Sequence, residues 1–386
     1  MPKLVRITTV PISMMVLLKG QMKFMSQNGF DVTMISSEGP EIPDLIAQEN
    51  CKHIAIKLTR KITPFTDIVS LIKLTFLLRK IKPDIVHTHT PKAGLIGMWA
   101  AKLAGVKVRL HTIAGLPWVE STGTMRRLLM NVEKITAFAA TAIYPNSFVQ
   151  RDFLSANGIA IGKMKVIGNG SSNGINTNHF SNNEIIDQQA NDIRHQLGIN
   201  KEGWIWIFVG RIVTDKGITE LIDAFLQIHK KFPDDKLLLL GVQEPELDPL
   251  DEKYLNLLQT HPAIQCCGFQ KDIRPYLAAS QVLVFPSYRE GFPNVPMQAG
   301  AMGCALILSD INGCNEIVNN GKDGWLVPVK NSSALAATMF EARNNESLTK
   351  QFAAAINEKI KSSYAQSFLW DCMLKEYHHL MTTSKS

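Results

Sequence analysis

Short apolar runs alternate with helix-like stretches along the whole chain, and this alternation constrains the fold more than any other feature. The runs in the first half are Leu4–Val10, Asp31–Ser37, His53–Leu58, Asp84–Thr90 and Val108–Ile113. Those in the second half are Trp204–Gly210, Lys236–Gly241, Ala263–Gly268, Val282–Ser287 and Ala305–Asp310. Strands separated by helices are typical of parallel βαβ units. The sequence therefore predicts an α/β protein with one doubly wound sheet in each half.

The length of 386 residues also favours two domains, because a single hydrophobic core rarely grows to that size. The polar stretch Ser181–Gly203 is loosely helical, and we place the domain boundary at its start. The predicted domains are therefore 1–180 and 181–364. The amphipathic C-terminal stretch, about 365–386, can pack back on either half, and we assign it to the first domain.

The N-terminus has the basic head and apolar stretch of a signal peptide, but Pro11 interrupts it and no small-residue cleavage site follows. We therefore expect a first strand and a loop there. No apolar run approaches the roughly 18 residues of a membrane-spanning helix. The six cysteines form no CxxC pair, which disfavours a zinc site or a disulfide framework and favours a reducing cytoplasm.

The formal net charge of +7 is distributed unevenly. Residues 1–180 contain 22 Lys and Arg against 10 Asp and Glu, whereas the remainder contains 19 against 24. A basic first half suggests an anionic partner there. Nucleic acid, an anionic membrane and a phosphorylated substrate all fit the charge, although no base-reading motif accompanies the basic residues.

The segment FVGRIVTDKG places two cations beside a strand end. The strand ends at Val209, Gly210 makes the turn, and a helix begins near Ile218. Arg211 and Lys216 can both reach an anion at such a strand end and helix N-terminus, which suits a diphosphate. The alternative is a pair of solvated surface cations.

The segment VLVFPSYREGFPNVPMQAGAMG places a carboxylate on a loop between a strand and a helix. Glu290 can accept hydrogen bonds from sugar hydroxyls there, while amides near the helix start can donate to other oxygens. Gln298, eight residues later, can face the same site. The alternative is a proline-rich loop with an exposed, ion-pairing Glu290.

Three further polar side chains lie at strand ends in the first half. His111 ends one strand before Ala114-Gly115, and His89 and Lys92 follow another. Each has a structural alternative, a core histidine or a helix N-cap cluster. The segment GNGSSNGIN has the spacing GxGxxxG and no P-loop motif occurs, so a nicotinamide enzyme and a P-loop enzyme are disfavoured.

Taken in order, these motifs resemble the retaining glycosyltransferases of the GT-B fold, family GT4. The resemblance covers essentially the whole chain. It rests on TVPIS…LLKGQ, PDIVHTHTPKAG, LHTIAGLPW, NGSSNGIN, VGRIVTDKG, CGFQKDIRPYLAASQVLVFPSYREGFPN and NGCNEIVNNGKDGWLVP. Within the family the chain looks most like bacterial enzymes that extend lipid-diphosphate-linked sugars for capsule, O-antigen or glycoprotein glycans.

The resemblance implies roles for individual residues. Arg211 and Lys216 would hold the donor diphosphate, and His111 and Glu290 would act at the donor sugar as catalytic-site residues without either being a dedicated base. The other implied contacts with donor sugar and nucleotide are Gly291, Phe292, Pro293, Asn294, Val295, Gln298, Phe269 and Gln270. No metal and no cofactor are implied, because the two cations already compensate the leaving-group charge.

Two positions depart from the family pattern. The usual pair Glu-x7-Glu reads Glu290 and Gln298, so we expect altered nucleotide binding. The usual Gly-Gly loop after the first strand reads Pro11-Ile12-Ser13, which puts diphosphate contact by that loop in doubt.

Within this resemblance, the basic residues of the first half would contact the acceptor or an anionic membrane. Met125–Ala140 and Leu71–Lys82 are basic and amphipathic, as are helices that lie on anionic leaflets. For Leu71–Lys82, packing into the core is an equally open alternative. We place acceptor or membrane contacts at Ser13, Lys19, His89, Lys92, Arg126 and Arg127.

The sequence therefore predicts transfer of a hexose or N-acetylhexosamine, with retention, from a nucleotide sugar that we expect to be UDP-linked. The expected acceptor is a polyprenyl-diphosphate-linked saccharide at the inner face of the cell membrane, and nucleic acid is not an expected partner. The alternatives are a nucleotide-sugar epimerase of the same fold and a nucleotide-sugar-binding module impaired by Gln298.

Overall fold

The computed structural model describes residues 1–119, 121–199, 203–244, 246 and 248–383. The chain forms two compact units. Unit 1 comprises Met1–Gly174 and helix α16 (Gln366–Thr383), and unit 2 comprises Ile175–Ala365. The units part at residues 174–175, whereas the boundary expected from the sequence lay at 180–181.

Unit 1 contains a sheet of six parallel strands in the order β3-β2-β1-β4-β5-β6. Its strands are β1 (Lys3–Ile7), β2 (Asp31–Ser36), β3 (Lys52–Ala55), β4 (Ile85–His89), β5 (Val108–Ile113) and β6 (Ala142–Pro145). Strands β1, β2, β4 and β5 are buried over most of their length, as parallel sheets covered on both faces require.

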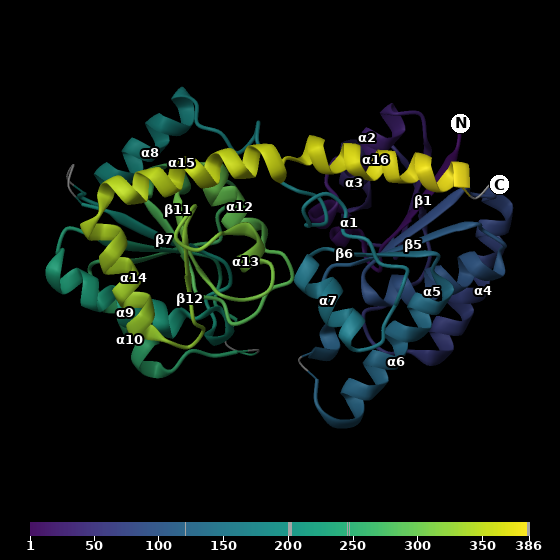
Figure 1. Ribbon diagram of the computed structural model, residues 1–386, viewed down its shortest axis with the longest axis horizontal. Coiled ribbons are helices and arrows are strands. Elements are labelled where there is room, and N and C mark those ends of the chain that lie inside the picture. Colours follow the sequence, from purple (N-terminus) through teal and green to yellow (C-terminus); the bar gives the residue numbers. More distant parts are fainter. Residues whose placement is uncertain (120, 200–202, 245, 247, 384–386) are drawn as a thin grey trace. The chain divides into compact units, whose positions relative to one another are not determined.

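The helices of unit 1 lie between and after these strands (Figure 1). They are α1 (Pro11–Leu17), α2 (Gln21–Gln27), α3 (Ile42–Glu49), α4 (Pro64–Ile81), α5 (Pro91–Leu103), the 3-10 turn η1 (Pro117–Val119), α6 (Gly123–Ala139) and α7 (Phe148–Ala156). Helices α1, α4 and α5 begin at a proline, whose fixed φ and missing N–H suit the first helical position.

Unit 2 repeats the topology with the strand order β12-β11-β10-β7-β8-β9. Its strands are β7 (Ile205–Val209), β8 (Lys236–Leu240), β9 (Ile264–Gly268), β10 (Val282–Phe285), β11 (Ala305–Ser309) and β12 (Trp325–Val327). Numbered within each unit, both sheets have the order 3-2-1-4-5-6, which is the doubly wound arrangement expected from the sequence.

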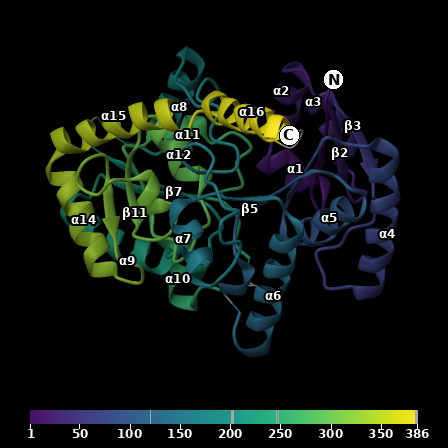
Figure 2. The ribbon, with the colours of Figure 1, turned by 45° about the vertical axis from the view of Figure 1, so that its right-hand side comes forward.

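The helices of unit 2 cover both faces of its sheet (Figure 1, Figure 2). They are α8 (Glu184–Gln196), the 3-10 turn η2 (Thr214–Lys216), α9 (Ile218–Lys231), α10 (Glu252–Thr260), α11 (Arg274–Ala279), α12 (Asn294–Ala301), α13 (Cys314–Ile317), α14 (Ser332–Asn344) and α15 (Glu346–Ser363).

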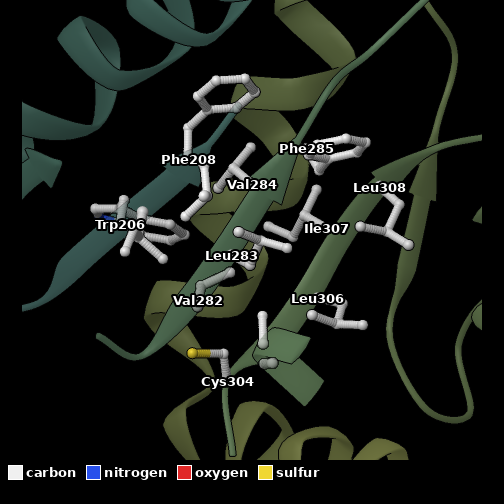
Figure 3. Packing of buried hydrophobic residues seen from close by; sticks show 14 of the residues in the cluster. Trp206, Phe208, Val282, Leu283, Val284, Phe285, Cys304, Leu306, Ile307 and Leu308 are labelled. Carbon is white, nitrogen blue, oxygen red and sulfur yellow. The ribbon is translucent and has the colours of Figure 1, made fainter. Parts of the chain in front are cut away.

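The three neighbouring strands β7, β10 and β11 contribute the part of the unit 2 core drawn in Figure 3. Trp206 and Phe208 come from β7, and the Phe208 ring stacks on Phe285 of β10 with 5.9 Å between ring centroids. Val284 of β10 and Ile307 of β11 are partners in the sheet and are both fully buried. This packing fixes the strand ends from which the functional loops emerge.

Ten of the twelve strands coincide with the apolar runs of the sequence, but two differences deserve a physical account. Strands β6 and β12 were not predicted. Strand β12 has only three residues, and β6 follows α6 after two residues within one apolar stretch, so no break in the sequence sets it apart. The loop expected at Pro11-Ile12-Ser13 is wrong, since these residues form the first turn of α1 after Val10 as the N-cap.

Helix α16 returns to unit 1 and lies beside α2, as both ribbon views show (Figure 1, Figure 2). Its Tyr377 is fully buried, and the hydroxyl hydrogen-bonds Arg6 of β1 and His87 Nδ1 of β4. Arg6 is itself 1% exposed and also donates to Gln21 Oε1 of α2. One buried guanidinium therefore ties the last helix to the first strand.

Removal of the Tyr377 hydroxyl tests this connection. In Tyr377→Phe, the buried Arg6 and His87 each lose a partner, so the free energy of unfolding of unit 1 should fall by about 1–3 kcal/mol. Calorimetry should show the unit 1 transition moving and the unit 2 transition staying. Tyr254→Phe, which removes a hydroxyl bonded to Asp223 in unit 2, is the matched control and should leave unit 1 unchanged. A wild-type unit 1 transition in Tyr377→Phe would contradict the assignment.

Candidate active site

The first candidate site lies in unit 2, where β7 and β10 are neighbours. The connections from these two strands leave toward opposite sides of the sheet, and open α/β sheets bind ligands at the carboxyl ends of such strands. Residues 210–217 follow β7, and residues 286–293 follow β10. The motifs FVGRIVTDKG and VLVFPSYREGFPN of the second half supply these two loops.

Gly217 brings the two loops into contact. It has a φ of +70°, and a Cβ built on it would lie 2.2 Å from the carbonyl oxygen of Pro286. Only glycine permits this approach. As a result, Lys216 Nζ donates a hydrogen bond of 2.7 Å to Glu290 Oε1 and lies 3.4 Å from Ser287 Oγ.

Arg211 lies in the same network of charges. Its Nη1 donates a 2.8 Å hydrogen bond to Glu244 Oε2, and its Nη2 lies 3.7 Å from Asp215 Oδ2. The hydrogen bond that Arg211 donates to Glu244 is the main cause that raises the pKa of Arg211, and the charges of Asp215, Glu244 and Glu290 add to it. The guanidinium side chain is 41% exposed, so it stays charged and accessible to an anion.

The loop that carries Glu290 is held from β11. Asn312 Nδ2 donates to the carbonyl oxygens of Gly291 at 2.7 Å and of Glu290 at 3.3 Å. Gly313, with φ +78°, allows the Gly291 carbonyl to approach so closely that a Cβ would lie 2.5 Å from it. These contacts fix Glu290 at the start of α12, whose first amides lack acceptors within the helix.

The remaining predicted residues of unit 2 lie in different environments. Phe292 and Pro293 are buried, and the Phe292 ring packs on Tyr364 with 5.6 Å between centroids. Phe269 follows β9 and is 76% exposed, which leaves its ring face available for stacking. The half-buried members are Gln270, Val295 and Gln298, and Asn294 is exposed.

The second candidate site lies in unit 1 around His111, at the end of β5. The ring is buried, its Nδ1 hydrogen-bonds Thr88 Oγ1 at 2.8 Å, and its Nε2 lies 4.0 Å from Glu133 Oε1 of α6. Burial lowers the pKa of His111 to about 4 and raises the pKa of Glu133 to about 7. Both groups therefore favour their neutral forms in mildly acidic solution.

Gly94 of α5 makes the room for the imidazole. A Cβ at this position would lie 2.4 Å from His111 Cε1 and 2.8 Å from Nε2. The glycine in the segment PKAG is therefore a packing requirement of His111, although it costs helix stability relative to alanine.

Among the other candidates of unit 1, His89 lies near His111, on the neighbouring strand β4. His89 is buried and stacks on His87, with ring centroids 4.4 Å apart, and burial holds its pKa well below the ordinary value. Lys92 forms an ion pair with Asp67 of α4. Ser13 is half-buried in α1, and the exposed residues are Lys19, Arg126 and Arg127.

Four functional-site neighbours were missed by the sequence analysis. Glu133 was hidden in a segment that we interpreted only as a basic amphipathic helix. Glu244, Ser287 and Asn312 contact the predicted residues through tertiary structure. Asn312 lies in the motif NGCNEIV, which was the one available signal for it.

Among the described residues there is no group of three or more His, Cys, Asp and Glu side chains arranged to hold a metal ion. The positive groups of the unit 2 site include Arg211, Lys216 and Arg289, whose Nη2 lies 3.1 Å from Asp215 Oδ2.

Both halves of the chain match family models of known proteins. The family model for glycosyl transferases group 1 matches residues 189–359, and the model for glycosyl transferase 4-like proteins matches residues 10–147. The capsular polysaccharide biosynthesis glycosyltransferase CapM of Staphylococcus aureus is 32% identical over 370 residues, covering 96% of this chain and 95% of that protein. The chain belongs to the group 1 glycosyltransferases.

Two further proteins resemble this glycosyltransferase over most of its length. The Escherichia coli UDP-Gal:alpha-D-GlcNAc-diphosphoundecaprenol alpha-1,3-galactosyltransferase is 27% identical over 332 residues, covering 83% of this chain and 84% of that protein. The crystal structure of Anabaena HepE in complex with UDP superposes with a TM-score of 0.81 at 19% identity, covering 98% and 100% of the two chains. The fold is accordingly GT-B, as the sequence predicted.

The burial of Glu133 predicts a pH-dependent stability. Between its ordinary pKa of 4.5 and its raised pKa of about 7, the folded glycosyltransferase holds a proton that the unfolded chain releases. This stabilisation is complete below pH 4.5 and is lost as the pH rises to 7. Relative to wild type, the free energy of unfolding of Glu133→Gln should therefore rise by about 3 kcal/mol between pH 5 and pH 8.

Chemical unfolding of both proteins at several pH values checks this expectation. His111 is present in both, so its own titration largely cancels in the difference. A difference in unfolding free energy that stays flat with pH would show that Glu133 is an ordinary, solvated carboxylate.

Proposed function

We propose that this glycosyltransferase transfers a hexose or N-acetylhexosamine from a UDP-sugar to a polyprenyl-diphosphate-linked saccharide, with retention of configuration. The observation that carries the proposal is the contact of Lys216 with Glu290, with Arg211 in the same charge network. Lys216 and Arg211 are cations suited to a diphosphate, and they lie beside Glu290, a carboxylate suited to sugar hydroxyls. A nucleoside diphosphate sugar is a ligand that presents both groups in that order.

The two cations account for the departure of the nucleotide. Arg211 is bonded to Glu244, and Lys216 to Glu290, so an incoming diphosphate exchanges with carboxylates that already hold the cations in place. Lys216 carries three protons and can keep Glu290 while it binds phosphate. Preorganised positive charge stabilises the leaving diphosphate without a metal ion.

Retention of the sugar's configuration does not require a dedicated base to remove the acceptor proton in this proposal. Glu290 is occupied by Lys216, and the His111 imidazole is buried with a lowered pKa, so neither is suited to remove the acceptor proton at neutral pH. We assign that proton to the departing phosphate oxygen on the same face of the sugar.

The acceptor is proposed from the relatives. The E. coli relative is named for a diphosphoundecaprenol-linked acceptor and a UDP-linked donor, and CapM is named for capsular polysaccharide biosynthesis. The excess of cations in residues 1–180 suits an acceptor that carries a diphosphate.

The proposal predicts the effect of two substitutions. Purified protein is incubated with UDP- and GDP-sugars and lipid-diphosphate-saccharide acceptors in the presence of a chelator, and transfer is followed by mass spectrometry. Lys216→Ala should lower kcat by about 10²–10³-fold, because a charge that stabilises the leaving group is lost. Glu290→Ala should lower kcat/KM by about 10²-fold.

The matched controls are Lys253→Ala and Glu346→Ala, which remove exposed, ion-paired side chains of unit 2 and should leave transfer unchanged. Conversion of the donor without any acceptor would instead indicate an epimerase. Donor binding without transfer to any acceptor would indicate a binding module, and loss of transfer on chelation would contradict the metal-free mechanism.

We also propose that unit 1 contacts an anionic membrane leaflet. Five side chains form what we term the α4 stripe, one apolar face of α4 at helical spacing, and they are half to almost fully exposed: Phe65, Ile68, Val69, Ile72 and Phe76. Lys73, Arg79 and Lys80 are exposed on the same helix. Apolar side chains flanked by cations fit a leaflet of anionic lipids.

The α4 stripe revises our interpretation of this region. The opposite side of α4 packs into the core through Leu74 and Leu78, which confirms the core-packing alternative for that face of the helix. Membrane contact stays a proposal for the α4 stripe. Helix α5 packs between α4 and α6, and α6 exposes Leu128 and Phe138. Within the described residues, no helix has both the length and the apolar character to cross a bilayer.

Flotation with vesicles tests the membrane contact. The double variant Phe65→Ser/Phe76→Ser should weaken binding to vesicles of phosphatidylglycerol and phosphatidylcholine at least tenfold, because two large apolar side chains are lost. Arg126→Glu/Arg127→Glu should weaken binding similarly at low salt and less at high salt. Ile185→Ser, which replaces an exposed apolar side chain of unit 2, is the control. Unchanged binding by both double variants would remove this surface as a membrane site.

A further inference from the structure

Unit 1 contains a cavity of about 310 Å³ at the carboxyl end of its sheet. This volume is about ten times that of a water molecule in the liquid. The wall combines apolar groups with two ionisable side chains, His111 and Glu133. It is lined by Thr90, Pro91, residues 111–116 and Glu133.

Glu133 is the unexplained member of this wall. Its side chain is 8% exposed, and within the described part of the chain its carboxyl group makes no hydrogen bond. A carboxyl group that is nine-tenths buried and faces an open pocket without a protein hydrogen-bond partner is available to a ligand.

The backbone beside the cavity gives a second, independent indication. Thr90 adopts φ +75° and ψ 144°, a conformation that costs a non-glycine residue about 1–3 kcal/mol. It is held there by a 2.7 Å hydrogen bond between its hydroxyl and that of Thr9, which follows β1. Strain of this kind persists where the surrounding structure fixes a functional loop.

The spacing of the two ionisable groups defines what they can bind. Glu133 Oε1 and His111 Nε2 are 4.0 Å apart, too far to hydrogen-bond each other. A single oxygen at about 2.8 Å from both atoms would form roughly a right angle between them, which is acceptable for a hydroxyl group. A hydroxyl donates one hydrogen bond and accepts another, and therefore satisfies both groups whichever of them holds the proton.

We propose that Glu133 and His111 together bind one hydroxyl group of a saccharide in this cavity. The apolar wall, with Pro91, Ile113 and Leu116, suits the C–H faces of a sugar ring. The inference deepens the proposed function and rests on it. The hydroxyl belongs to the donor sugar or to the acceptor saccharide, and the experiment distinguishes the two.

Steady-state kinetics of Glu133→Ala and Glu133→Gln, with donor and acceptor varied separately, provide the test. Glu133→Ala should raise KM about tenfold for the substrate that owns the hydroxyl and leave the other KM unchanged. Glu133→Gln keeps a donor and an acceptor and should recover most of the loss. Glu376→Gln removes an equally buried carboxylate of unit 1, bonded to Tyr144 and Lys165, and is the matched control.

Deoxy analogues of both substrates separate a contact from a structural effect. One analogue should cost the wild type about tenfold in kcat/KM and cost Glu133→Ala nothing further, because the partner of that hydroxyl is already absent. Losses that add for every analogue would mean that Glu133 acts only on the structure, and unchanged KM values would overturn the inference outright.

A direct binding measurement keeps this inference distinct from the proposed function. Wild-type protein without any transfer activity would refute the proposed function alone. Saturation-transfer NMR with methyl hexosides would then still test the cavity. Signals present for wild type and lost in Glu133→Ala would support the inference, and equal signals, or none for wild type, would overturn it.

Discussion

Parallel pairing of every described strand is the constraint on which the rest of the glycosyltransferase depends. In a parallel sheet all carboxyl ends lie at one edge, so the loops that follow the strands are gathered there by the backbone hydrogen bonds alone. Unit 1 thereby presents Thr90 and His111 at one edge, and unit 2 presents Lys216 and Glu290. Two glycines then permit close approaches that a side chain would block: Gly94 lies against the His111 imidazole, and Gly217 lies against Pro286.

The ionisable side chains of the two candidate sites lie in opposite environments. In unit 2 the cations are partly exposed and already bonded to carboxylates, so they remain charged and ready to exchange one anion for another. In unit 1 the ionisable side chains are buried, and desolvation moves the pKa values of His111 and Glu133 toward each other's range. A charged diphosphate suits the first environment, and an uncharged hydroxyl suits the second.

The sequence predicts the sheets well because buried parallel strands are nearly continuous apolar runs, such as Trp204–Gly210. It also indicates Arg211, Lys216 and Glu290, since each follows a recognisable strand end. It does not indicate Glu133, because the burial of that carboxylate arises from the packing of α6 against distant parts of unit 1. For the same reason it could not tell that Lys92 pairs with Asp67 or that His89 stacks on His87.

The return of α16 to unit 1 has a consequence for the order of events on the ribosome. Unit 2 is continuous in sequence, and Ile175 at its start bridges Ala365 at its end. It can therefore complete its fold as soon as Ala365 has emerged. Unit 1 begins earlier, yet its buried Arg6 acquires the Tyr377 hydroxyl only after α16 has been made. Unit 1 is thus synthesised before unit 2 but completes its fold after it. Until α16 is made, the surface of unit 1 around β1 and α2 stays uncovered, and a chaperone that binds nascent chains would bind there.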